Sequence, residues 1–284
     1  MKFGLIPINI GIENAEQMIG LAQLAESVGF ESVWTFEHVI VPLDYKSKYP
    51  YSPTGKMGAA PETNFFDPLI ALTAVATQTK KLRLGTGVNI LSQTNPLILA
   101  KQVASLDRIS NGRFMLGVGI GWLREEFVAM GTPFERRGAR FDDYVAAMRK
   151  VWSGETVEHD SDFLDWHGFK SYPLPVQKPL PVIIGGSKGK IFERIAKHGD
   201  GWFAPMGDPA ELGNALKQLA SVCKRLGRDY GELEITAMFP PQAEPDVLKR
   251  MADLGVARVT VFTPMEPDPV TALKRFGEQV IAKS

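Results

Sequence analysis

The sequence predicts a closed (β/α)8 barrel of the α/β class, and three observations lead to it. Short apolar runs alternate with segments of helical periodicity from one end of the 284-residue chain to the other. Several of these runs are apolar almost throughout, which is typical of parallel strands buried on both faces. The β–α unit recurs eight times, and eight units favour a closed barrel over the alternative, an open doubly wound sheet.

We predict eight strands from the apolar runs. They cover Lys2–Pro7, Ser32–Phe36, Leu82–Thr86, Phe114–Val118, Pro181–Ile184, Gly201–Ala204, Glu234–Met238 and Arg258–Phe262. Segments between them repeat apolar residues at helical spacing, most clearly over 141–152. A small polar residue followed by proline marks four helix starts, because the polar side chain caps the first turn and proline needs no N–H partner there. These pairs are Asp67-Pro68, Asn95-Pro96, Asp208-Pro209 and Asp268-Pro269.

We interpret residues 1–284 as one domain with two insertions. The segment from about 38 to 66 is rich in Pro, Gly and Tyr and follows the second predicted strand. It therefore lies at the C-terminal mouth of the barrel, where long loops often act as lids; an inert surface loop is the alternative. The segment from about 155 to 178 mixes charges, aromatic residues and prolines, and we predict a small hairpin there.

Charge and composition narrow the class of partner. The chain carries 32 basic and 32 acidic residues, so its formal net charge is zero. This balance does not indicate a nucleic-acid or anionic-membrane partner, and no apolar run is long enough to span a bilayer. The start of the chain lacks a signal-peptide pattern, and the single cysteine, Cys223, lies on the apolar stripe of a predicted helix. We therefore expect a cytoplasmic protein that acts on a small molecule.

Two predicted strands end in glycine clusters, Gly117-Val-Gly-Ile-Gly121 and Gly185-Gly-Ser187. Glycine lets the backbone approach a ligand closely, and the start of the helix beyond each cluster offers free N–H groups to a phosphate. Neither cluster is a dinucleotide-binding fingerprint or a P-loop. The pair predicts one phosphate-bearing cofactor held from two strand ends, and glycines that only permit tight packing are the alternative. A further strand ends in Leu84-Gly-Thr-Gly-Val88, which indicates a bulge beside a flat ring.

A titratable pair, Glu37-His38, follows the second predicted strand. Polar residues at the C-terminal end of a barrel strand are typical of catalysis, and histidine transfers protons near neutral pH. The alternative is a histidine that only caps the strand through a backbone hydrogen bond. His159 and His167 lack the further ligands that a metal site needs, so we predict no metal.

An ordered series of motifs along nearly the whole chain resembles the luciferase-like flavin superfamily. Within it, the chain is most similar to the oxidoreductases that use coenzyme F-420, an 8-hydroxy-5-deazaflavin. The motifs are Phe3-Gly-Leu5, Glu37-His38, Leu84-Gly-Thr-Gly-Val88, Gly117-Val-Gly-Ile-Gly-Trp-Leu-Arg-Glu-Glu-Phe127, Arg136-Arg-Gly-Ala-Arg140, Ile183-Ile-Gly-Gly-Ser187 and Gly199-Asp-Gly-Trp202.

The resemblance implies a barrel with the deazaflavin in its mouth, usually as a homodimer. The resemblance implies a non-proline cis peptide at Gly87-Val88 behind the deazaflavin ring. It also implies that His38 lies beside the ring. Glu37 stands where the family usually has Asp. The cofactor phosphate is expected to contact the backbone around Gly119, Gly121, Gly185, Gly186 and Ser187. Ile120 and Trp122 are further candidates for cofactor binding.

One departure from the family pattern bears on the substrate. Trp122 stands where the sugar-phosphate dehydrogenases of this branch have an acid, and the loop Ile8-Asn-Ile10 is mostly apolar. Both favour a flatter, more apolar substrate.

We therefore predict an oxidoreductase that moves a hydride between coenzyme F-420 and a small apolar or flat organic substrate. His38 is the expected proton donor or acceptor, with Glu37 as the second catalytic candidate. One alternative keeps the fold and uses FMN, reduced by a separate flavin reductase, in a monooxygenase reaction. The other alternative is a non-catalytic protein that binds the cofactor.

Overall fold

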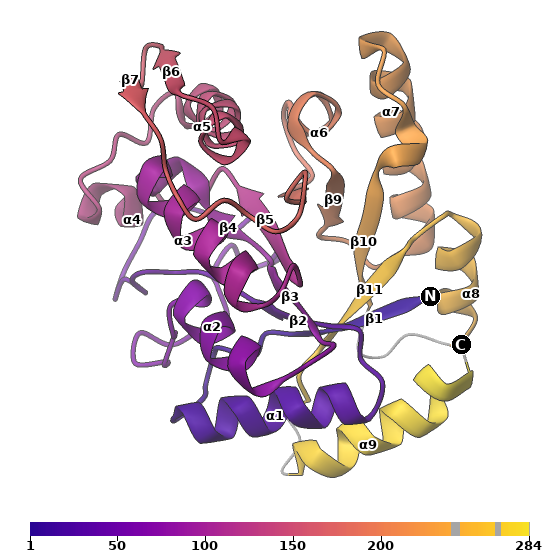
Figure 1. Cartoon of the computed structure of the whole chain (residues 1–284). Coiled ribbons are helices and arrows are strands. Elements are labelled where there is room, and N and C mark those ends of the chain that lie inside the picture. The colour runs from indigo at the N-terminus through magenta and orange to yellow at the C-terminus, as the bar shows by residue number, and fades with distance from the viewer. Residues whose placement is uncertain (240–244, 265–267, 284) are drawn as a thin grey trace.

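The computed structural model describes residues 1–239, 245–264 and 268–283. Within these ranges all eight predicted strands are present, and each bound lies within one residue of its prediction. Figure 1 shows how the strands and helices are arranged. The strands are β1 (Lys2–Ile6), β2 (Ser32–Thr35), β3 (Arg83–Thr86), β5 (Phe114–Gly119), β8 (Val182–Gly185), β9 (Gly201–Ala204), β10 (Glu234–Phe239) and β11 (Arg258–Phe262).

These strands form a closed parallel sheet. Their order around the sheet is β3-β2-β1-β11-β10-β9-β8-β5, and β5 pairs in parallel with β3 to complete the ring. A short strand, β4 (Asn89–Ile90), pairs with the end of β5 beside this closure. The predicted closed barrel is therefore confirmed, and the open sheet is excluded.

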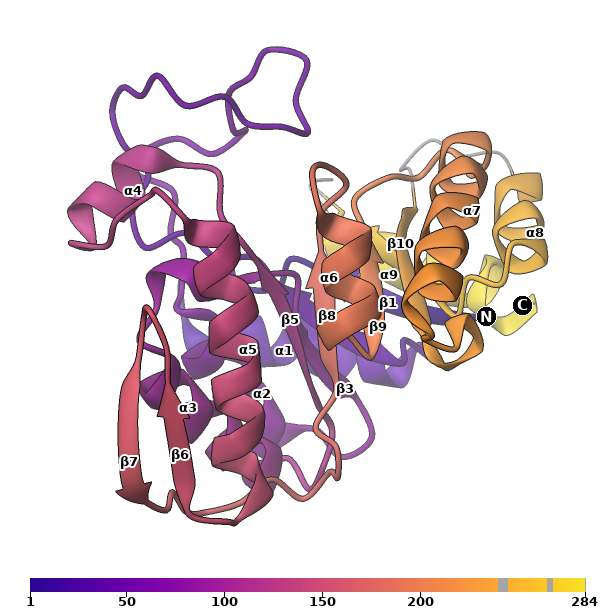
Figure 2. The same ribbon diagram turned by 90° about the horizontal axis from the view of Figure 1, so that it is seen from above.

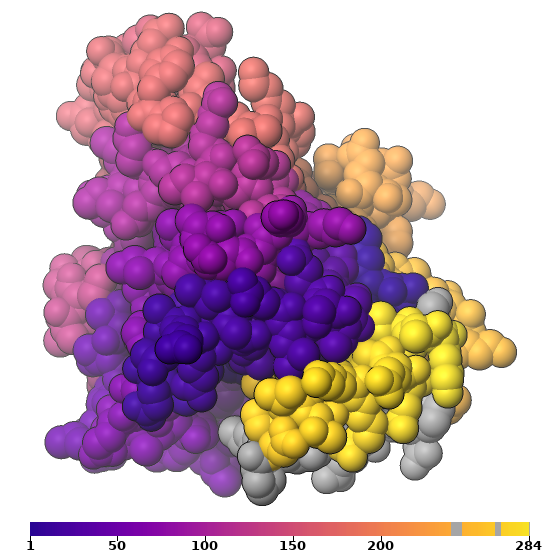
Figure 3. All heavy atoms as spheres, turned by 60° about the horizontal axis from the view of Figure 1, so that its bottom comes forward, coloured from indigo at the N-terminus to yellow at the C-terminus, as the bar shows by residue number. Residues whose placement is uncertain are grey.

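Each barrel strand is followed by a helix that packs on the outside of the ring (Figures 1 and 2). The helices are α1 (Ala15–Ser27), α2 (Pro68–Gln78), α3 (Pro96–Ile109), α4 (Arg124–Ala129), α5 (Arg137–Ser153), α6 (Ile191–His198), α7 (Pro209–Leu226), α8 (Pro245–Asp253) and α9 (Pro269–Gln279). Short 3₁₀ turns cover Leu91–Gln93, Tyr230–Glu232 and Ile281–Lys283. Figure 3 shows the first helix, α1, against the last, α9, on the surface of the molecule. No helix of the described ranges is long and apolar enough to cross a membrane.

The four polar–proline pairs begin helices as predicted. The side chains of Asp67, Asn95 and Asp208 each accept two backbone N–H groups of the following turn, at 2.8–3.1 Å. Asp268 accepts one, from Thr271, at 3.0 Å. These caps fix where α2, α3, α7 and α9 begin, and hence the length of the loop before each helix.

Two segments extend the barrel. A long connection, residues 36–67, joins β2 to α2 and projects beside α4 (Figure 2). An antiparallel hairpin of β6 (Val157–Asp160) and β7 (Asp165–Phe169) lies between α5 and β8. Only the connection after β2 adjoins the C-terminal rim of the barrel, because the hairpin precedes a strand instead of following one.

The inside of the barrel is packed with side chains. Trp34 is fully buried there and packs against Phe203, with ring centroids 5.3 Å apart. The Trp34 indole fits only because Gly85 has no side chain, since a Cβ on Gly85 would lie 2.4 Å from Trp34. A barrel filled in this way leaves only its rim and loops for a ligand.

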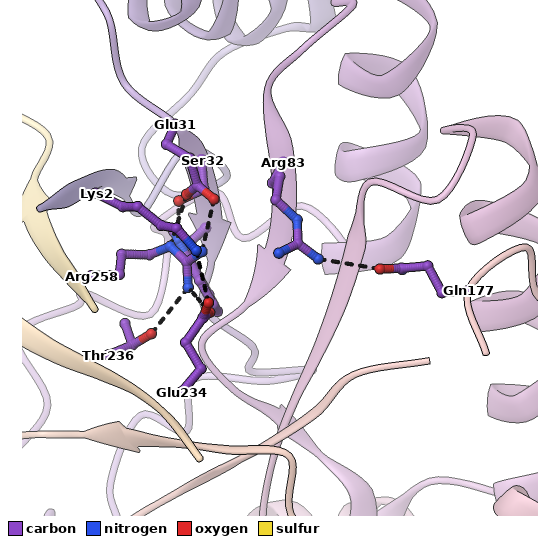
Figure 4. Close-up of polar contacts among 9 residues, drawn as sticks. Lys2, Glu31, Ser32, Arg83, Gln177, Glu234, Thr236 and Arg258 are labelled. Carbon is purple, nitrogen blue, oxygen red and sulfur yellow. Dashed lines mark hydrogen bonds and ion pairs between the residues drawn. The ribbon is translucent and has the colours of Figure 1, made fainter. Parts of the chain in front are cut away.

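An ion-pair network closes the other end of the barrel, where the strands begin (Figure 4). The Arg258 side chain is 0 % exposed and donates to both carboxylate oxygens of Glu31 at 2.8 Å. It also donates to Glu234 at 2.5 Å, and Lys2 pairs with the same carboxylate at 2.9 Å. This end is therefore a structural plug, and it lies opposite the rim that carries the predicted site.

Candidate functional site

The predicted site residues come together at one rim of the barrel. Glu37 and His38 follow β2, Gly87 and Val88 follow β3, and the glycine clusters lie at the ends of β5 and β8. All of these strands are parallel. Their C-terminal ends therefore meet at the same rim, which is where (β/α)8 enzymes place their chemistry.

Val88 lies at the centre of this rim. The peptide bond between Gly87 and Val88 is cis, as the resemblance implied. The two methyl groups of Val88 fill the space over β5 and β8, since a Cβ on Gly119 or on Gly185 would lie 2.7 Å from one of them. Packing against Val88 is therefore reason enough for glycine at these two positions.

Gly121 and Gly186, also in these clusters, are explained by their backbone conformation and not by packing against Val88. Gly121 has φ of 75° and Gly186 has φ of 124°, conformations that side chains rarely adopt. Within the described residues, the backbone N–H groups of Gly121 and Ser187 donate to no protein acceptor. Free N–H groups at two neighbouring strand ends fit a phosphate, so the donor set suits the phosphate tail of a flavin or deazaflavin.

Glu37 braces the peptide that follows Val88. Its carboxyl accepts from Asn89 Nδ2 at 2.8 Å and from the backbone N–H of Ile90. Burial raises the pKa of Glu37 to about 8, and the nearby Glu126 and Asp67 act in the same direction, against the Ile90 hydrogen bond. Burial therefore favours the protonated, neutral form of Glu37.

The proton on Glu37 has an acceptor at hand. Asn89 Oδ1 is buried and has no partner among the described residues. If the Asn89 amide is turned by 180°, a change that keeps its shape, Oδ1 accepts from the protonated Glu37. Glu37 thus holds the backbone beneath Val88 and does not bind His38.

His38 is held by a residue that sequence reasoning missed. Its Nδ1 lies 3.0 Å from Oε2 of Glu126 on α4, and the two side chains are 12 % and 2 % exposed. The other carboxylate oxygen, Oε1, accepts from the backbone N–H of Val39 at 2.6 Å and of Ile40 at 3.5 Å. Edge-on contacts from Phe65 and Trp122 confine the imidazole, with ring centroids 5.9 and 5.8 Å away.

Nothing in the spacing of Glu126 marks it as part of the site. It is 88 residues from His38 and follows another glutamate in the first turn of a helix, where acids usually only favour the helix dipole. The one available signal was its place in the motif that begins at Gly117 and ends at Phe127.

The long loop after His38 is fastened to α4. Glu125 accepts from the backbone N–H groups of Lys46 at 2.8 Å and Ser47 at 3.3 Å. Trp122 packs against Tyr45 and Tyr49, with centroids 5.7 and 5.1 Å away. The loop therefore has the placement expected of a lid.

The far side of the loop reaches the second glycine cluster. The hydroxyl of Tyr51 lies beside Gly186, 3.8 Å from where a Cβ would stand, and interacts with the Ser187 side chain. Desolvation by its neighbours raises the pKa of Tyr51 to about 12, and Tyr49 adds to the rise, although the residue is 45 % exposed. A neutral tyrosine thus bridges the long loop and the predicted phosphate site.

A cavity of about 310 Å³ lies elsewhere, at the beginnings of β8 and β9. Arg149 and Asp200 line it and pair with each other at 2.6 Å. None of the predicted site residues lines this cavity, so it is separate from the rim. No group of three His, Cys, Asp or Glu side chains suited to a metal occurs in the described part of the chain.

Comparison with known proteins assigns the chain to a family. A family model described as "Luciferase-like monooxygenase" matches residues 5–270. The chain belongs to the luciferase-like family. An uncharacterized protein of Mycobacterium tuberculosis is 34 % identical over 244 residues, which is 86 % of this chain and 86 % of that protein. A 5,10-methylenetetrahydromethanopterin reductase of Methanolobus tindarius is 29 % identical over 263 residues, covering 93 % of this chain and 72 % of that enzyme.

Solved structures of the same fold include proteins named for each of the two cofactors considered above. The coenzyme F-420-dependent tetrahydromethanopterin reductase of Methanopyrus kandleri has a TM-score of 0.79 at 18 % identity, covering 99 % of each chain. The oxygenating part of a diketocamphane monooxygenase of Pseudomonas putida, solved with FMN, has a TM-score of 0.76 at 16 % identity, covering 100 % of this chain and 98 % of that one. At this identity the likeness establishes the fold alone.

Proposed function

We propose that this luciferase-like protein is an oxidoreductase that moves a hydride between coenzyme F-420 and a small, flat or apolar organic substrate. The observation that carries the proposal is His38: a confined imidazole at the barrel mouth, paired with a buried carboxylate. A proton donor or acceptor at that place is what a hydride transfer to or from a substrate carbonyl, alkene or alcohol needs.

The residues at the rim have separate tasks in this proposal. Gly87 and Val88 form the surface behind the ring, and the phosphate tail is held by Gly119 to Trp122 and by Gly185 to Ser187. When bound, the deazaflavin supplies the hydride chemistry. His38 gives or takes the balancing proton at Nε2. The loop 38–66 excludes water from the mouth, and its rings favour a flat substrate.

Cofactor titration is the first test. Purified protein is titrated with coenzyme F-420 and, separately, with FMN, and the quenching of cofactor fluorescence is followed. We expect micromolar or tighter binding of the deazaflavin and much weaker binding of FMN. Binding of neither cofactor would contradict the phosphate site, and therefore the proposal.

Substitution of the histidine tests the proton role. His38→Ala should keep F-420 binding and lose turnover by at least about 100-fold on whichever alcohol or unsaturated substrate a screen identifies. His167→Ala is the matched control, because that histidine is exposed on the hairpin. Full turnover by His38→Ala with cofactor bound would remove His38 from the reaction.

An FMN-dependent monooxygenase is the second candidate, favoured by the FMN-bound diketocamphane monooxygenase of the same fold. It requires a separate reductase to supply reduced FMN. Oxygen consumption with reduced FMN and a substrate, together with preferential FMN binding, would replace the first proposal by this one. Tight binding of either cofactor without turnover across a broad panel would instead indicate a binding protein.

A further inference from the structure

We infer that Glu126 is a positioning residue that keeps His38 as the Nδ1–H tautomer, so that Nε2 is the atom that exchanges protons at the barrel mouth. This inference rests on the proposed function for its catalytic meaning. It also makes a claim about the imidazole that can be measured without any cofactor.

The hydrogen bonds around Glu126 have a defined direction. Backbone N–H groups can only donate, and two of them, from Val39 and Ile40, point at Oε1. The carboxylate is therefore an acceptor on this side. Its remaining oxygen, Oε2, lies 3.0 Å from Nδ1 of His38. We assign Oε2 as an acceptor as well, so that the hydrogen of this contact lies on Nδ1 of His38.

The other ring nitrogen of His38, Nε2, faces the barrel mouth in this proposal. Nε2 of His38 has no partner among the described residues and is not a buried unpaired atom. It is thus the open nitrogen of an imidazole whose side chain is 12 % exposed. With Nδ1–H donated to Glu126, the lone pair of neutral His38 lies on Nε2, which can take a proton from a substrate and return it.

The two acids near His38, Glu37 and Glu126, have different hydrogen-bond partners. Glu37 is adjacent in sequence, but its carboxyl bonds to Asn89 and Ile90. Glu126 is distant in sequence and makes the contact to the ring. The acid that follows the strand therefore braces the backbone, and the acid on α4 orients the base. A carboxylate beside Nδ1 also stabilises the imidazolium that forms when Nε2 accepts a proton.

Replacing Glu126 by glutamine gives a sharp prediction. In Glu126→Gln the amide oxygen must stay against Val39 and Ile40, because those donors cannot turn. The amide NH₂ then faces Nδ1 and donates to it, which drives His38 to the Nε2–H tautomer. The variant keeps size and shape while it reverses the ring's hydrogen-bonding pattern.

The experiment measures the tautomer directly. Protein labelled with ¹⁵N-histidine is examined by NMR near neutral to mildly basic pH, and the His38 signals are assigned by their loss in His38→Ala. We expect Nδ1–H in the wild type and Nε2–H as the main form in Glu126→Gln. On the active enzyme, kcat should fall on the order of 100-fold with an altered pH profile, while KM and the cofactor Kd change less than about threefold.

Glu158→Gln is the matched control, since Glu158 likewise lies 2.9 Å from the Nδ1 of a histidine, His167, but on the exposed hairpin. It should leave the His38 tautomer, kcat, KM and the cofactor Kd as in wild type. If Glu126→Gln does not fold, Glu126→Asp, which keeps an acceptor at shorter reach, should retain Nδ1–H with reduced kcat.

Two outcomes would overturn the inference. One is an Nε2–H tautomer of His38 in the wild type. The other is an unchanged tautomer and kcat in Glu126→Gln. Failure of the proposed function looks different: the tautomer would switch as expected, but the protein would neither bind coenzyme F-420 nor transfer a hydride with it.

Discussion

The side chain of Val88 occupies the place that a Cβ on Gly185 would take, with Cγ1 2.7 Å from that position. Val88 follows β3 and Gly185 ends β8, so the contact spans the barrel mouth between two strands that are distant in sequence. It shows that a glycine in a predicted cofactor motif can be required by packing before any ligand is considered.

Gly185→Ala should lower the free energy of unfolding by about 1–3 kcal/mol, because the short, branched Val88 cannot swing away from the new methyl group. Denaturant unfolding measures the change. In a Val88→Ala background the same substitution should cost less than half as much, since the opposing methyl is gone.

Gly20→Ala is the control for this first prediction. A Cβ at Gly20, on the exposed face of α1, meets nothing within 4 Å. The change should raise stability by up to about 1 kcal/mol, as alanine favours a helix over glycine. Equal costs of Gly185→Ala with and without Val88 would contradict the packing argument.

Glu37 should make the protein less stable as pH rises. Its pKa is about 8 in the folded state against 4.5 ordinarily, so between these values the folded protein holds a proton that the unfolded chain has released. The free energy of unfolding therefore falls from about pH 4.5 to 8, by a few kcal/mol at most. Glu37→Gln removes the titrating group and should flatten this part of the curve.

The urea midpoints of wild type and Glu37→Gln are measured from pH 5 to 9. The difference between the two midpoints at each pH tests this prediction. Other groups titrate in both proteins and cancel in the difference. Glu62→Gln, in the exposed part of the same connection, should leave the wild-type curve unchanged. If the urea midpoints of wild type and Glu37→Gln changed with pH in parallel, folding would not raise the pKa of Glu37.

The Arg258 plug should fail in acid. Burial by itself would raise the pKa of Glu234, but Arg258 and Lys2 outweigh burial and lower this pKa to about 2. Arg258 also lowers the pKa of Glu31, again against the effect of burial. The stabilisation is fully present above the ordinary value of 4.5 and is lost as pH falls toward 2.

Glu234→Gln should therefore cost about 1–3 kcal/mol at pH 7 and much less at pH 3, as measured by thermal or urea unfolding. Asp162→Asn breaks the Arg136 pair, whose side chains are 60 % and 69 % exposed, and should cost no more than about 1 kcal/mol. A Glu234→Gln cost that does not shrink in acid would rule out the ion pair as its source.

The long loop after His38 should detach from the rim more often without Trp122. Trp122 packs against Tyr45 and Tyr49 of the loop, and aromatic contacts contribute roughly 0.5–1.5 kcal/mol each. Trp122→Ala should speed tryptic cleavage after the exposed Lys46 and Lys48 by about tenfold, with mass spectrometry locating the cuts. Tyr172→Ala, at an exposed tyrosine elsewhere, should leave cleavage at wild-type rate.

Much of the architecture could be predicted from local patterns. Apolar runs gave the eight strands to within one residue, and polar–proline pairs gave four helix starts. These features follow from interactions between near neighbours in the chain: burial of a strand on both faces and capping of a first turn. Because parallel strands place all their C-terminal ends at one rim, strand order also brought Glu37, His38 and the glycine clusters together.

Tertiary structure decided which partner each residue of the site has. Glu126 reaches His38 only because α4 lies beside the start of the long loop, and Glu37 turns away to Asn89. Val88 decides which glycines are needed for space. Such contacts join residues dozens of positions apart, and their hydrogen-bond and steric energies depend on ångström-scale distances that only the folded barrel defines. Periodicity and motif spacing record which residues are available, whereas the closed ring determines how they pair.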